Sequence, residues 1–375
     1  MKNLFVYGTL RHVPLLEAVL GKTAEALKLA PARLKDHAVY AVQGQDFPII
    51  KDAPGEVAEG LWIGALTEAD VARLEFYEGG FDYDLEPVTV DLDGTTQTTE
   101  VFKSEDAGWV PDGPWSLSAW QERYGVAAVF GAIEEMSYFG TRSREDVDRM
   151  LPMIRARATS KAQAQARNLA VSPSGMTRDD VSDVMLNRPY AKYFTLDELT
   201  LSFRRYDGAQ SEMVERAVFV ATDAVIVLPY DPVRDRVMLI EQFRPGPYVR
   251  GDALPWQLEP IAGRIDAGET AENTARREAE EEAGLTLGAL HEVANCYASP
   301  GCTTEFYNIF VGLADLPDDV IGVSGLDQEA EDIRSYLFSY DRLMEMVDQM
   351  QAVNAPLVLA ALWLARHRDR LRRTA

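Results

Sequence analysis

The sequence predicts an α+β protein with two domains, and three observations support this expectation. The chain has 375 residues, which is more than one hydrophobic core commonly organises. Short β-rich runs fill residues 33–102 and return after residue 193, whereas residues 116–165 carry a helical pattern. A small, polar stretch over residues 162–174 ends in a Ser-Pro-Ser-Gly loop signal. We therefore expect one domain over residues 1–115, a helical extension and linker over 116–185, and a second domain over 186–375.

Hydrophobic periodicity and turn residues define the expected elements of both domains. The expected helices cover residues 13–20, 68–77, 271–283 and 355–371. The expected strands include residues 4–7, 61–63, 88–92, 217–228, 237–242, 290–298 and 306–313. The turn Tyr230-Asp231-Pro232 predicts that the strands over 217–228 and 237–242 form a hairpin.

The charge of the chain limits its partners. Sixty acidic residues against 37 basic residues give a formal net charge of −23. Such a field repels the phosphates of nucleic acid, so we expect no nucleic-acid partner. It also repels small anionic substrates, so a phosphate site requires a metal ion or a local basic cluster. The basic run over 366–373 is interpreted as a solvated helix end, because the helix dipole favours positive charge there.

The remaining composition indicates a reduced, aqueous compartment. Cys296 and Cys302 form no Cys-x-x-Cys pair and have no accompanying histidine cluster, which argues against a zinc site or a disulfide framework. No stretch approaches the ~20 apolar residues of a membrane span, and the N-terminus lacks the pattern of a secretion signal. We expect a cytoplasmic protein that does not contact membranes.

One segment of the second domain carries a recognisable pattern of carboxylates. Thr270 is suited to begin a helix and Gly284 to end it. Between them Glu278, Glu281 and Glu282 lie at i, i+3 and i+4, so they share one helical face. Three like charges on one face need a neutralising partner, and Mg²⁺ prefers carboxylate and phosphate oxygens. The alternative interpretation is a solvated acidic face, but the fixed spacing of the whole segment argues against it.

The segment over 263–285 matches the pattern G-x5-E-x7-R-E-U-x-E-E-x-G-U at every fixed position, so this half resembles the Nudix hydrolases. Over residues 189–371 it is similar to the bacterial ADP-ribose pyrophosphatase branch of that family. The similar segments are residues 193–197, 225–244, 255–263, 298–301, 325–334 and 354–364. The resemblance implies an α/β/α sandwich, a homodimer formed through this domain, and Mg²⁺ as cofactor with Mn²⁺ as a substitute.

The same resemblance implies a role for individual residues. The metal shell would comprise the carbonyl of Ala262 and the carboxylates of Glu278, Glu281, Glu282 and Glu331. Glu329 would deprotonate the attacking water, with Glu281 and Glu282 also counted as catalytic. Glu269 and Arg277 would pair, and with Gly263 they would hold the loop and helix together. Arg216 and Arg244 would hold the phosphates or the terminal ribose, and Tyr193 or Phe194 would stack on adenine. Arg216 and Tyr193 would serve the partner subunit's site.

Plainer interpretations of these residues stay open. Glu329 and Glu331 would then be exposed acids of an acidic loop, and Arg244 a residue on the surface of a strand. Tyr193 and Phe194 would be ordinary packing residues.

The first domain carries two shorter signals, FVYGTLR over residues 5–11 and LEFYEG over 74–79. They resemble the γ-glutamylcyclotransferase family, also described as AIG2-like, over residues 3–105. The resemblance implies a small mixed β-barrel in which Tyr7, Gly8, Thr9 and Leu10 cradle the substrate. Glu78 would act as acid and base while an α-amine attacks its own γ-amide. The chain departs from the family at residues 83–85, where Tyr-Asp-Leu stands instead of a tyrosine followed by arginine.

Three hypotheses for the whole chain follow. The first is hydrolysis of ADP-ribose to AMP and ribose 5-phosphate by the Nudix-like domain, attached to a cyclotransferase-like domain. The second keeps the chemistry but changes the substrate to another nucleoside diphosphate derivative, such as a nucleotide sugar. The third is a sensor that binds ADP-ribose without turnover. The intact set of acids argues against the third, because binding alone does not need all of them.

Overall fold

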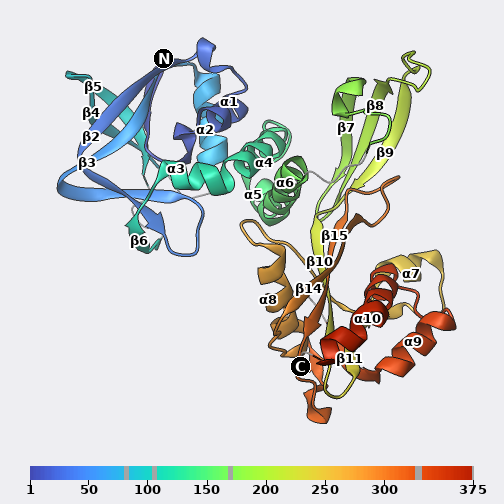
Figure 1. The fold of residues 1–375 in the computed structure, drawn as a ribbon. Coiled ribbons are helices and arrows are strands. Elements are labelled where there is room, and N and C mark those ends of the chain that lie inside the picture. The colour runs from blue at the N-terminus through green and yellow to red at the C-terminus, as the bar shows by residue number, and fades with distance from the viewer. Residues whose placement is uncertain (80–83, 104–107, 168–171, 326–331, 374–375) are drawn as a thin grey trace. The chain divides into compact units, whose positions relative to one another are not determined.

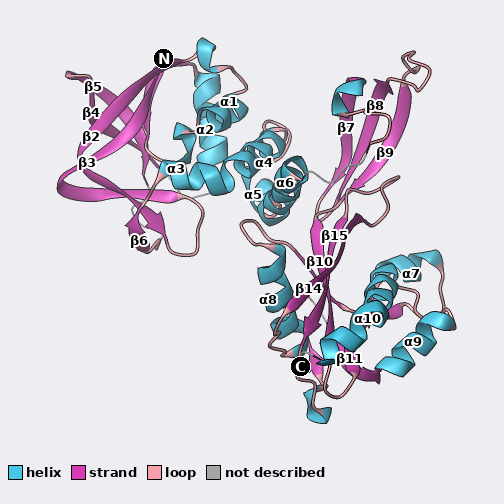
Figure 2. Ribbon diagram, viewed as in Figure 1, coloured by secondary structure: helices cyan, strands magenta, loops and turns pink. Residues whose placement is uncertain are grey.

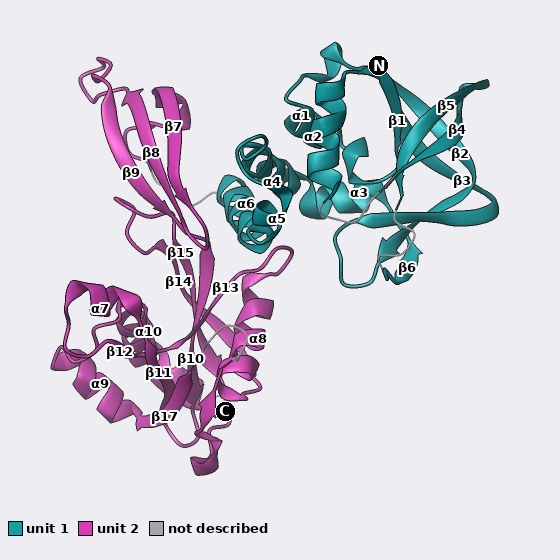
Figure 3. Cartoon of the chain, turned by 180° about the vertical axis from the view of Figure 1, so that it is seen from behind, with its two compact units in different colours: residues 1–169 teal, residues 170–375 magenta. Residues whose placement is uncertain are grey.

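The computed structural model describes residues 1–79, 84–103, 108–167, 172–325 and 332–373. The chain divides into two compact units, residues 1–169 and residues 170–375 (Figures 1 and 3). Each unit combines strands with helices (Figure 2). The expectation of a two-domain protein that mixes α and β structure is confirmed.

Unit 1 contains a sheet whose strands are followed by a run of helices. Its strands are β1 (Lys2–Val6), β2 (Lys28–Val42), β3 (Pro48–Leu66), β4 (Asp84–Leu92), β5 (Thr95–Lys103) and β6 (Pro111–Pro114). Its α-helices are α1 (Val13–Leu20), α2 (Glu68–Glu78), α3 (Leu117–Trp120), α4 (Val126–Met136), α5 (Arg144–Asp148) and α6 (Leu151–Ala166). Short helical turns are η1 (Thr9–Arg11), η2 (Ala24–Ala26) and η4 (Gln121–Gly125).

Five strands of unit 1 close into a barrel. The order is β3-β1-β5-β4-β2, and β2 pairs back onto β3. The long antiparallel ladder between β2 and β3 runs from Lys28↔Gly64 to Ala41↔Pro48. β1 pairs with β5 in parallel, so the barrel is mixed. The small mixed barrel implied by the sequence resemblance is therefore confirmed.

The first two helices of unit 1 begin and end where local sequence dictates. Gly21 adopts a left-handed conformation (φ 66°) and ends α1. α2 begins with a capping box in which the backbone N–H of Thr67 donates to Asp70 Oδ2 at 2.9 Å, and the Asp70 N–H donates to Thr67 Oγ1 at 3.2 Å. The helix ends at Glu78, the residue singled out in this domain.

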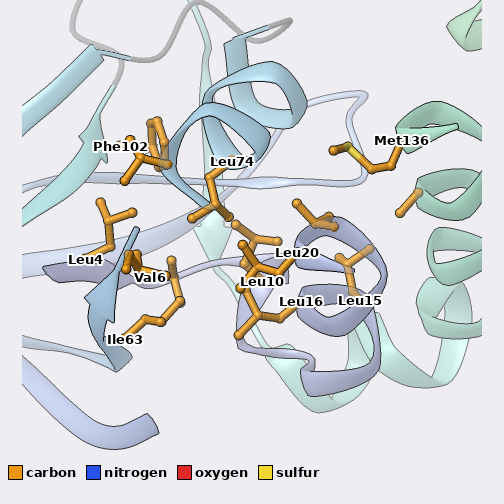
Figure 4. Close-up of a cluster of buried hydrophobic side chains, with 14 of the residues drawn as sticks. Leu4, Val6, Leu10, Leu15, Leu16, Leu20, Ile63, Leu74, Phe102 and Met136 are labelled. Carbon is orange, nitrogen blue, oxygen red and sulfur yellow. The ribbon is translucent and has the colours of Figure 1, made fainter. Parts of the chain in front are cut away.

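One hydrophobic core joins the barrel to these helices and to the helices that follow it. Leu15 and Leu16 of α1 and Leu74 of α2 are fully buried against Leu4 and Ile63 of the barrel (Figure 4). The later helices contribute to the same core through Trp120, Ala132 and Met136. Residues of α3 and α4 are thus part of the packing of unit 1.

Unit 2 contains a three-stranded sheet and a larger sheet with helices. Its strands are β7 (Val181–Ala191), β8 (Thr195–Phe203), β9 (Val214–Val220), β10 (Asp223–Asp231), β11 (Arg236–Phe243), β12 (Trp256–Glu259), β13 (Ile261–Arg264), β14 (Leu290–Tyr297), β15 (Phe306–Leu313), β16 (Val323–Ser324) and β17 (Ile333–Ser339). Its helices are η5 (Arg178–Asp180), α7 (Pro245–Arg250), α8 (Ala271–Ala283), η6 (Asp318–Val320), α9 (Tyr340–Asp348) and α10 (Ala355–Arg373).

The expected strand over 217–228 is two strands. β9 ends at Val220 and belongs to the small sheet β7-β8-β9, whereas β10 starts at Asp223 and belongs to the large sheet. The expected hairpin is also short, because β10 pairs with β11 only at Tyr230↔Val237 and Asp231↔Arg236. β10 otherwise pairs with β13 and β15, and β11 pairs with β12 and β17. Local apolar periodicity marks strands but carries no information about their partners.

The large sheet is covered on both faces. Val225 and Val227 of β10 pack with Ala275, Ala279 and Ala283 of α8. The intervening residues of β10 face the other way and pack with α9 and α10; they are Ile226, Leu228 and Tyr230. Because strand residues alternate between faces, this pattern defines the α/β/α sandwich that the resemblance implies. None of the helices in the described ranges has the length and apolar character of a membrane span.

We predict that Leu364→Ala destabilises unit 2 by about 2–5 kcal/mol, because Leu364 of α10 is fully buried against the sheet. Leu362→Ala is the matched control, since Leu362 lies on the same helix and is 51% exposed; its effect should stay within about 0.5 kcal/mol. Hydrogen exchange of β10 and β11 in the full chain measures both changes. Equal effects of the two substitutions would contradict the packing described.

Candidate functional site

The loop and helix of the second domain are held in place by the sheet. β13 pairs with β10 through Val225↔Gly263 and Ile226↔Ala262, so the loop after Arg264 starts from a fixed strand. Thr270 caps α8 by accepting a hydrogen bond from the Asn273 N–H at 3.2 Å. α8 spans Ala271–Ala283 as expected, and Gly284 ends it in a left-handed conformation (φ 62°).

Arg277 is the centre of an ion-pair network at this site. Its Nε and Nη2 donate to the two oxygens of Glu269, each at 3.0 Å. Its Nη1 lies 2.8 Å from Glu278 Oε1 and 2.8 Å from Glu281 Oε2. Nη2 also reaches the carbonyl of Arg264 at 3.3 Å. One guanidinium thus links the loop to two of the acids on the helix, and the expected pairing of Glu269 with Arg277 is present.

Ion pairing stabilises the charged forms of Glu269 and Arg277. Burial alone would raise the pKa of Glu269, but hydrogen bonds from Arg277 and from Thr274, at 2.8 Å, outweigh it and lower that pKa. Burial acts against the charge of Arg277, and its acidic partners outweigh it and raise the pKa of the guanidinium. Glu269 and Arg277 therefore stay charged across physiological pH.

Glu282 and Glu278 lie against β13. Glu282 is 2% exposed, and its Oε2 accepts a hydrogen bond from the Ala262 N–H at 3.2 Å. Glu278 lies so close to Gly263 that a Cβ on that residue would come within 1.9 Å of the Glu278 carboxylate. Glycine at position 263 therefore provides the space that the Glu278 side chain fills.

The donor set suits a hard divalent cation. Glu278, Glu281 and Glu282 offer carboxylate oxygens on one helix face, which is the ligand type that Mg²⁺ prefers. In the described ranges, no three His, Cys, Asp or Glu side chains converge closely enough to hold a metal ion. Arg277 occupies one oxygen of Glu278 and one of Glu281 in this arrangement. These residue types fit a divalent cation. A bound cation would share the carboxylates of Glu278 and Glu281 with Arg277.

Glu329 and Glu331 lie outside the described residues. The chain on either side of them is described: β16 pairs with β17 at Val323↔Arg334 and Ser324↔Ile333. β16 also contacts α8. The strand that precedes residues 326–331 therefore lies beside the acidic helix.

Arg244 has a buried acidic partner. Its Nε donates to Glu259 Oε1 at 2.8 Å, and its Nη2 lies 2.6 Å from the same oxygen. Burial raises the pKa of Glu259, and Arg244 opposes this. Burial also raises the pKa of Glu305, again opposed by Arg244. Arg244 is thus held by acids at the end of β11, with its side chain 39% exposed.

The residues expected to grip the nucleoside are only partly brought together. Tyr193, between β7 and β8, accepts a hydrogen bond from Arg264 of β13 at 3.3 Å, so it lies next to the loop. Phe194 packs edge-on against Tyr193 and contacts Phe219, with ring centroids 4.7 Å apart in each pair. Arg216 is exposed on β9, opposite Leu199. It is four residues from the end of that strand, ~13 Å along it, and its Nη1 donates to the carbonyl oxygen of Glu215 at 2.7 Å.

The cradle expected in unit 1 lies between β1 and α1. Gly8 precedes η1, and Thr9 and Leu10 lie within it. A Cβ on Gly8 would come 2.9 Å from Pro48 Cγ, so a larger residue there would require Pro48 to shift. Tyr7 is buried with the barrel residues, whereas Leu10 packs in the core that also holds α2. Tyr83, which the resemblance implies as a wall of the substrate pocket, lies outside the described residues.

Glu78 sits at the end of α2 among other titratable groups. Burial and the nearby Glu135 raise the pKa of Glu78 to about 8, and Arg144 opposes them. Burial likewise raises the pKa of Tyr77, together with Glu135 and Glu78. A carboxyl group that titrates near neutral pH is suited to exchange protons in either direction.

Glu135 and Arg144 were not singled out by the sequence motifs. Glu135 belongs to α4, whose remaining residues are almost all apolar or small. It is 6% exposed, which is unusual for a glutamate. A carboxylate on the apolar side of a helix was the available signal, and its partner could be found only from the fold. Glu259 of β12 was also missed, and its pairing with Arg244 likewise could be found only from the fold.

Comparisons with known proteins match the two halves of the chain to different family models. Residues 4–117 match the family model described as gamma-glutamyl cyclotransferase, AIG2-like, and residues 220–360 match the model of the NUDIX domain. An ADP-ribose pyrophosphatase of Shigella flexneri is 38% identical over 200 residues, which cover 53% of this chain and 95% of that protein. This chain belongs to the Nudix family. Both resemblances stated from the sequence are confirmed.

Relatives of this domain are named for more than one substrate. A GDP-mannose pyrophosphatase of the Crooks strain of Escherichia coli is 30% identical over 174 residues, covering 46% of this chain and 88% of that protein. A crystal structure described as an ADP compounds hydrolase has a TM-score of 0.41 and 22% identity, covering 51% of this chain and 95% of that chain. The match to the NUDIX model and the two pyrophosphatase relatives show that this domain is a hydrolase.

We predict that Gly263→Ala lowers the hydrolytic activity of the Nudix domain by roughly 10- to 100-fold, because the new Cβ displaces the Glu278 carboxylate. Folding should change little, since Glu278 is a flexible side chain. Gly246→Ala is the control, because a Cβ there meets nothing within 4 Å. Steady-state kinetics and thermal unfolding measure the two effects, and wild-type activity in Gly263→Ala would contradict the close contact.

Proposed function

We propose that the Nudix domain hydrolyses ADP-ribose to AMP and ribose 5-phosphate with Mg²⁺ as cofactor. The observation that carries this proposal is the Arg277 network, which holds Glu269, Glu278 and Glu281 around one guanidinium beside Glu282. The relative named ADP-ribose pyrophosphatase, at 38% identity, supports the choice of substrate. In the reaction, water adds to one phosphorus and the P–O bond to the bridging oxygen breaks.

The residues of the domain would divide the work as follows. Glu278, Glu281, Glu282, Glu331 and the carbonyl of Ala262 would hold the metal. When bound, Mg²⁺ supplies positive charge to the diphosphate and lowers the pKa of water. Arg277 would keep the loop and the acidic helix in register, as its bonds to Glu269 and the Arg264 carbonyl do here. Glu329 is the proposed base that takes the proton from the attacking water.

Specificity would come from residues outside the acidic helix. Arg244 would bind a phosphate or the terminal ribose, since a guanidinium offers paired donors to phosphate oxygens. Tyr193 or Phe194 would stack on adenine, and both side chains are exposed. Arg216 would complete the site.

We propose that the active form is a homodimer assembled through the Nudix domain. The small sheet β7-β8-β9 leaves many large apolar side chains exposed, and Arg216 lies on the same sheet. The exposed side chains of β7 are Val181, Val184, Met185, Leu186 and Tyr190. A second copy covering this sheet would bury apolar surface and bring Arg216 and Tyr193 to the partner's site.

We predict that the purified protein releases AMP from ADP-ribose with Mg²⁺ and that Glu282→Gln abolishes this release. Glu282 is the buried acid beside Ala262, and its amide analogue loses the charge a cation needs. Glu280→Gln is the matched control, because Glu280 is exposed on the same helix. Reaction in ¹⁸O-labelled water, followed by mass spectrometry, shows which phosphorus receives the oxygen.

The alternatives are outcomes of the same experiment. Turnover of GDP-mannose or another nucleotide sugar in preference to ADP-ribose would support the second hypothesis, for which a GDP-mannose pyrophosphatase is the relevant relative. Tight ADP-ribose binding without AMP release would support the sensor hypothesis. Absence of both binding and release from a metal-loaded dimer would overturn the ADP-ribose proposal.

We propose a second activity for unit 1, because residues 4–117 match the gamma-glutamyl cyclotransferase model and burial raises the pKa of Glu78, at the end of α2, to about 8. The activity is intramolecular cyclisation of γ-glutamyl amides. The α-amine attacks the γ-carbonyl carbon, a new C–N bond closes the ring, and the original amide C–N bond breaks. Glu78 would take a proton from the attacking amine and return it to the leaving amine. The products are 5-oxoproline and a free amine.

We predict that a panel of γ-glutamyl amides yields 5-oxoproline with this protein, detected by mass spectrometry. Glu78→Gln should lower the rate by about 10²- to 10⁴-fold, the contribution of a general acid–base group. Glu75→Gln, on the exposed side of the same helix, should leave the rate unchanged. Equal rates in Glu78→Gln and wild type would assign the chemistry to another group.

A further inference from the structure

Two helices beyond the cyclotransferase match contribute charged groups to the surroundings of Glu78. The family model ends at residue 117, whereas α4 spans Val126–Met136 and α5 spans Arg144–Asp148. Glu135 of α4 is 6% exposed and forms an ion pair with Arg144 of α5. A buried carboxylate paired with a guanidinium is costly unless the pair is well satisfied. The position of this pair therefore needs an explanation.

Arg144 binds the end of the helix that carries Glu78. Its Nη1 donates to the carbonyl oxygen of Phe76 at 2.7 Å, and its guanidinium lies 5.5 Å from the centroid of the Phe76 ring. The carbonyls of the last helical turn have no partner within their own helix, and a cation is favoured at that end. Arg144 thus fixes the last turn of α2 two residues before Glu78.

The other bonds of Arg144 hold it in this position. Its Nε donates to Asp148 Oδ1 at 2.7 Å within α5. Phe76 also packs edge-on against Phe139, with ring centroids 5.4 Å apart, so the same turn contacts the segment between α4 and α5. The guanidinium is therefore shared among α2, α4 and α5.

We propose that Glu135 and Arg144 are positioning residues of the cyclotransferase site, in which Arg144 fixes the turn that carries Glu78 and the pair balances the charge around its carboxylate. This inference rests on the acid–base function proposed for Glu78. It extends the functional site of unit 1 to helices that lie beyond the family match.

The ionisation of the neighbouring groups agrees with this arrangement. Glu135 raises the pKa of Glu78 and Arg144 lowers it, in addition to the larger effect of burial. Burial raises the pKa of Glu135 itself, opposed by Arg144. The other charged or titratable groups that face this cluster are Tyr77 on α2, Asp148 on α5, Arg155 on α6 and Asp46 before β3. Each single change at the pair should therefore move the titration of Glu78 in a defined direction.

The expected directions follow from charge. Glu135→Gln removes a negative neighbour, which favours ionised Glu78, so its titration midpoint should fall by about one pH unit. Arg144→Gln removes a positive neighbour, so the midpoint should rise. The double variant removes both charges and should lie between the two single variants. It also avoids leaving an unpaired charge in the interior, which would destabilise Arg144→Gln.

The experiment is a ¹³C NMR titration of the full chain with ¹³Cδ-labelled glutamate, in which Glu78→Gln identifies the Glu78 resonance. Glu145→Gln is the control, because this residue is on α5 with its side chain 84% exposed. The lower pH limb of kcat/KM for 5-oxoproline formation should move in the same direction as each midpoint, since Glu78 must be ionised to accept a proton. An unchanged or raised midpoint in Glu135→Gln would overturn the inference.

The two proposals for unit 1 fail in distinguishable ways. The NMR midpoints are measured whether or not the protein turns over a γ-glutamyl amide. Glu78-dependent turnover with midpoints that do not respond to Glu135→Gln would overturn the positioning role and leave the cyclotransferase proposal intact. Shifted midpoints in a protein that forms no 5-oxoproline would overturn the cyclotransferase proposal and retain the electrostatic coupling.

Discussion

The Nudix half of this protein depends on one guanidinium that neutralises several carboxylates. Glu278 and Glu281 place like charges within a single helical turn, and without Arg277 their repulsion would not be neutralised. Arg277 also reaches Glu269 and the carbonyl of Arg264, so the same group that relieves repulsion also fixes the loop. This arrangement explains how a chain with a net charge of −23 can maintain an acidic site. The guanidinium holds these acids close together, which is a condition for binding a divalent cation.

Unit 1 handles its buried charge in a related way at smaller scale. Arg144 is paired with Glu135 and bonded to the end of α2, so one guanidinium again joins separate elements. The two sites differ in the state of the acid. Glu269 has a lowered pKa because its partners donate directly to it, whereas Glu78 has a raised pKa because burial and Glu135 dominate. One environment favours a permanent charge, and the other favours proton exchange near neutral pH.

Local patterns in the sequence predicted what depends on local chemistry. The helix over 271–283, its cap at Thr270 and its end at Gly284 were expected and found, because each depends on neighbouring residues. The division of residues 214–231 between two sheets was missed, since nothing in an apolar run indicates which strand it will pair with. The pairing of Arg244 with Glu259 and of Arg144 with Glu135 joins segments brought together only by the fold. Arg216 and Tyr193 remain predictions that depend on a second subunit.

The packing of α3 and α4 into the barrel core has a consequence for modularity. The recognisable cyclotransferase segment ends at residue 117, yet Trp120, Ala132 and Met136 complete the core beneath α1 and α2. The segment that packs around one core is therefore longer than the segment that matches the family model. A recombination event that moved only residues 4–117 would transfer a barrel with an uncovered apolar surface and an α2 that lacks the bond from Arg144 to the Phe76 carbonyl. Helices α3 and α4 would have to be transferred together with the barrel. The folding boundary of this domain therefore lies beyond residue 117, where the family match ends.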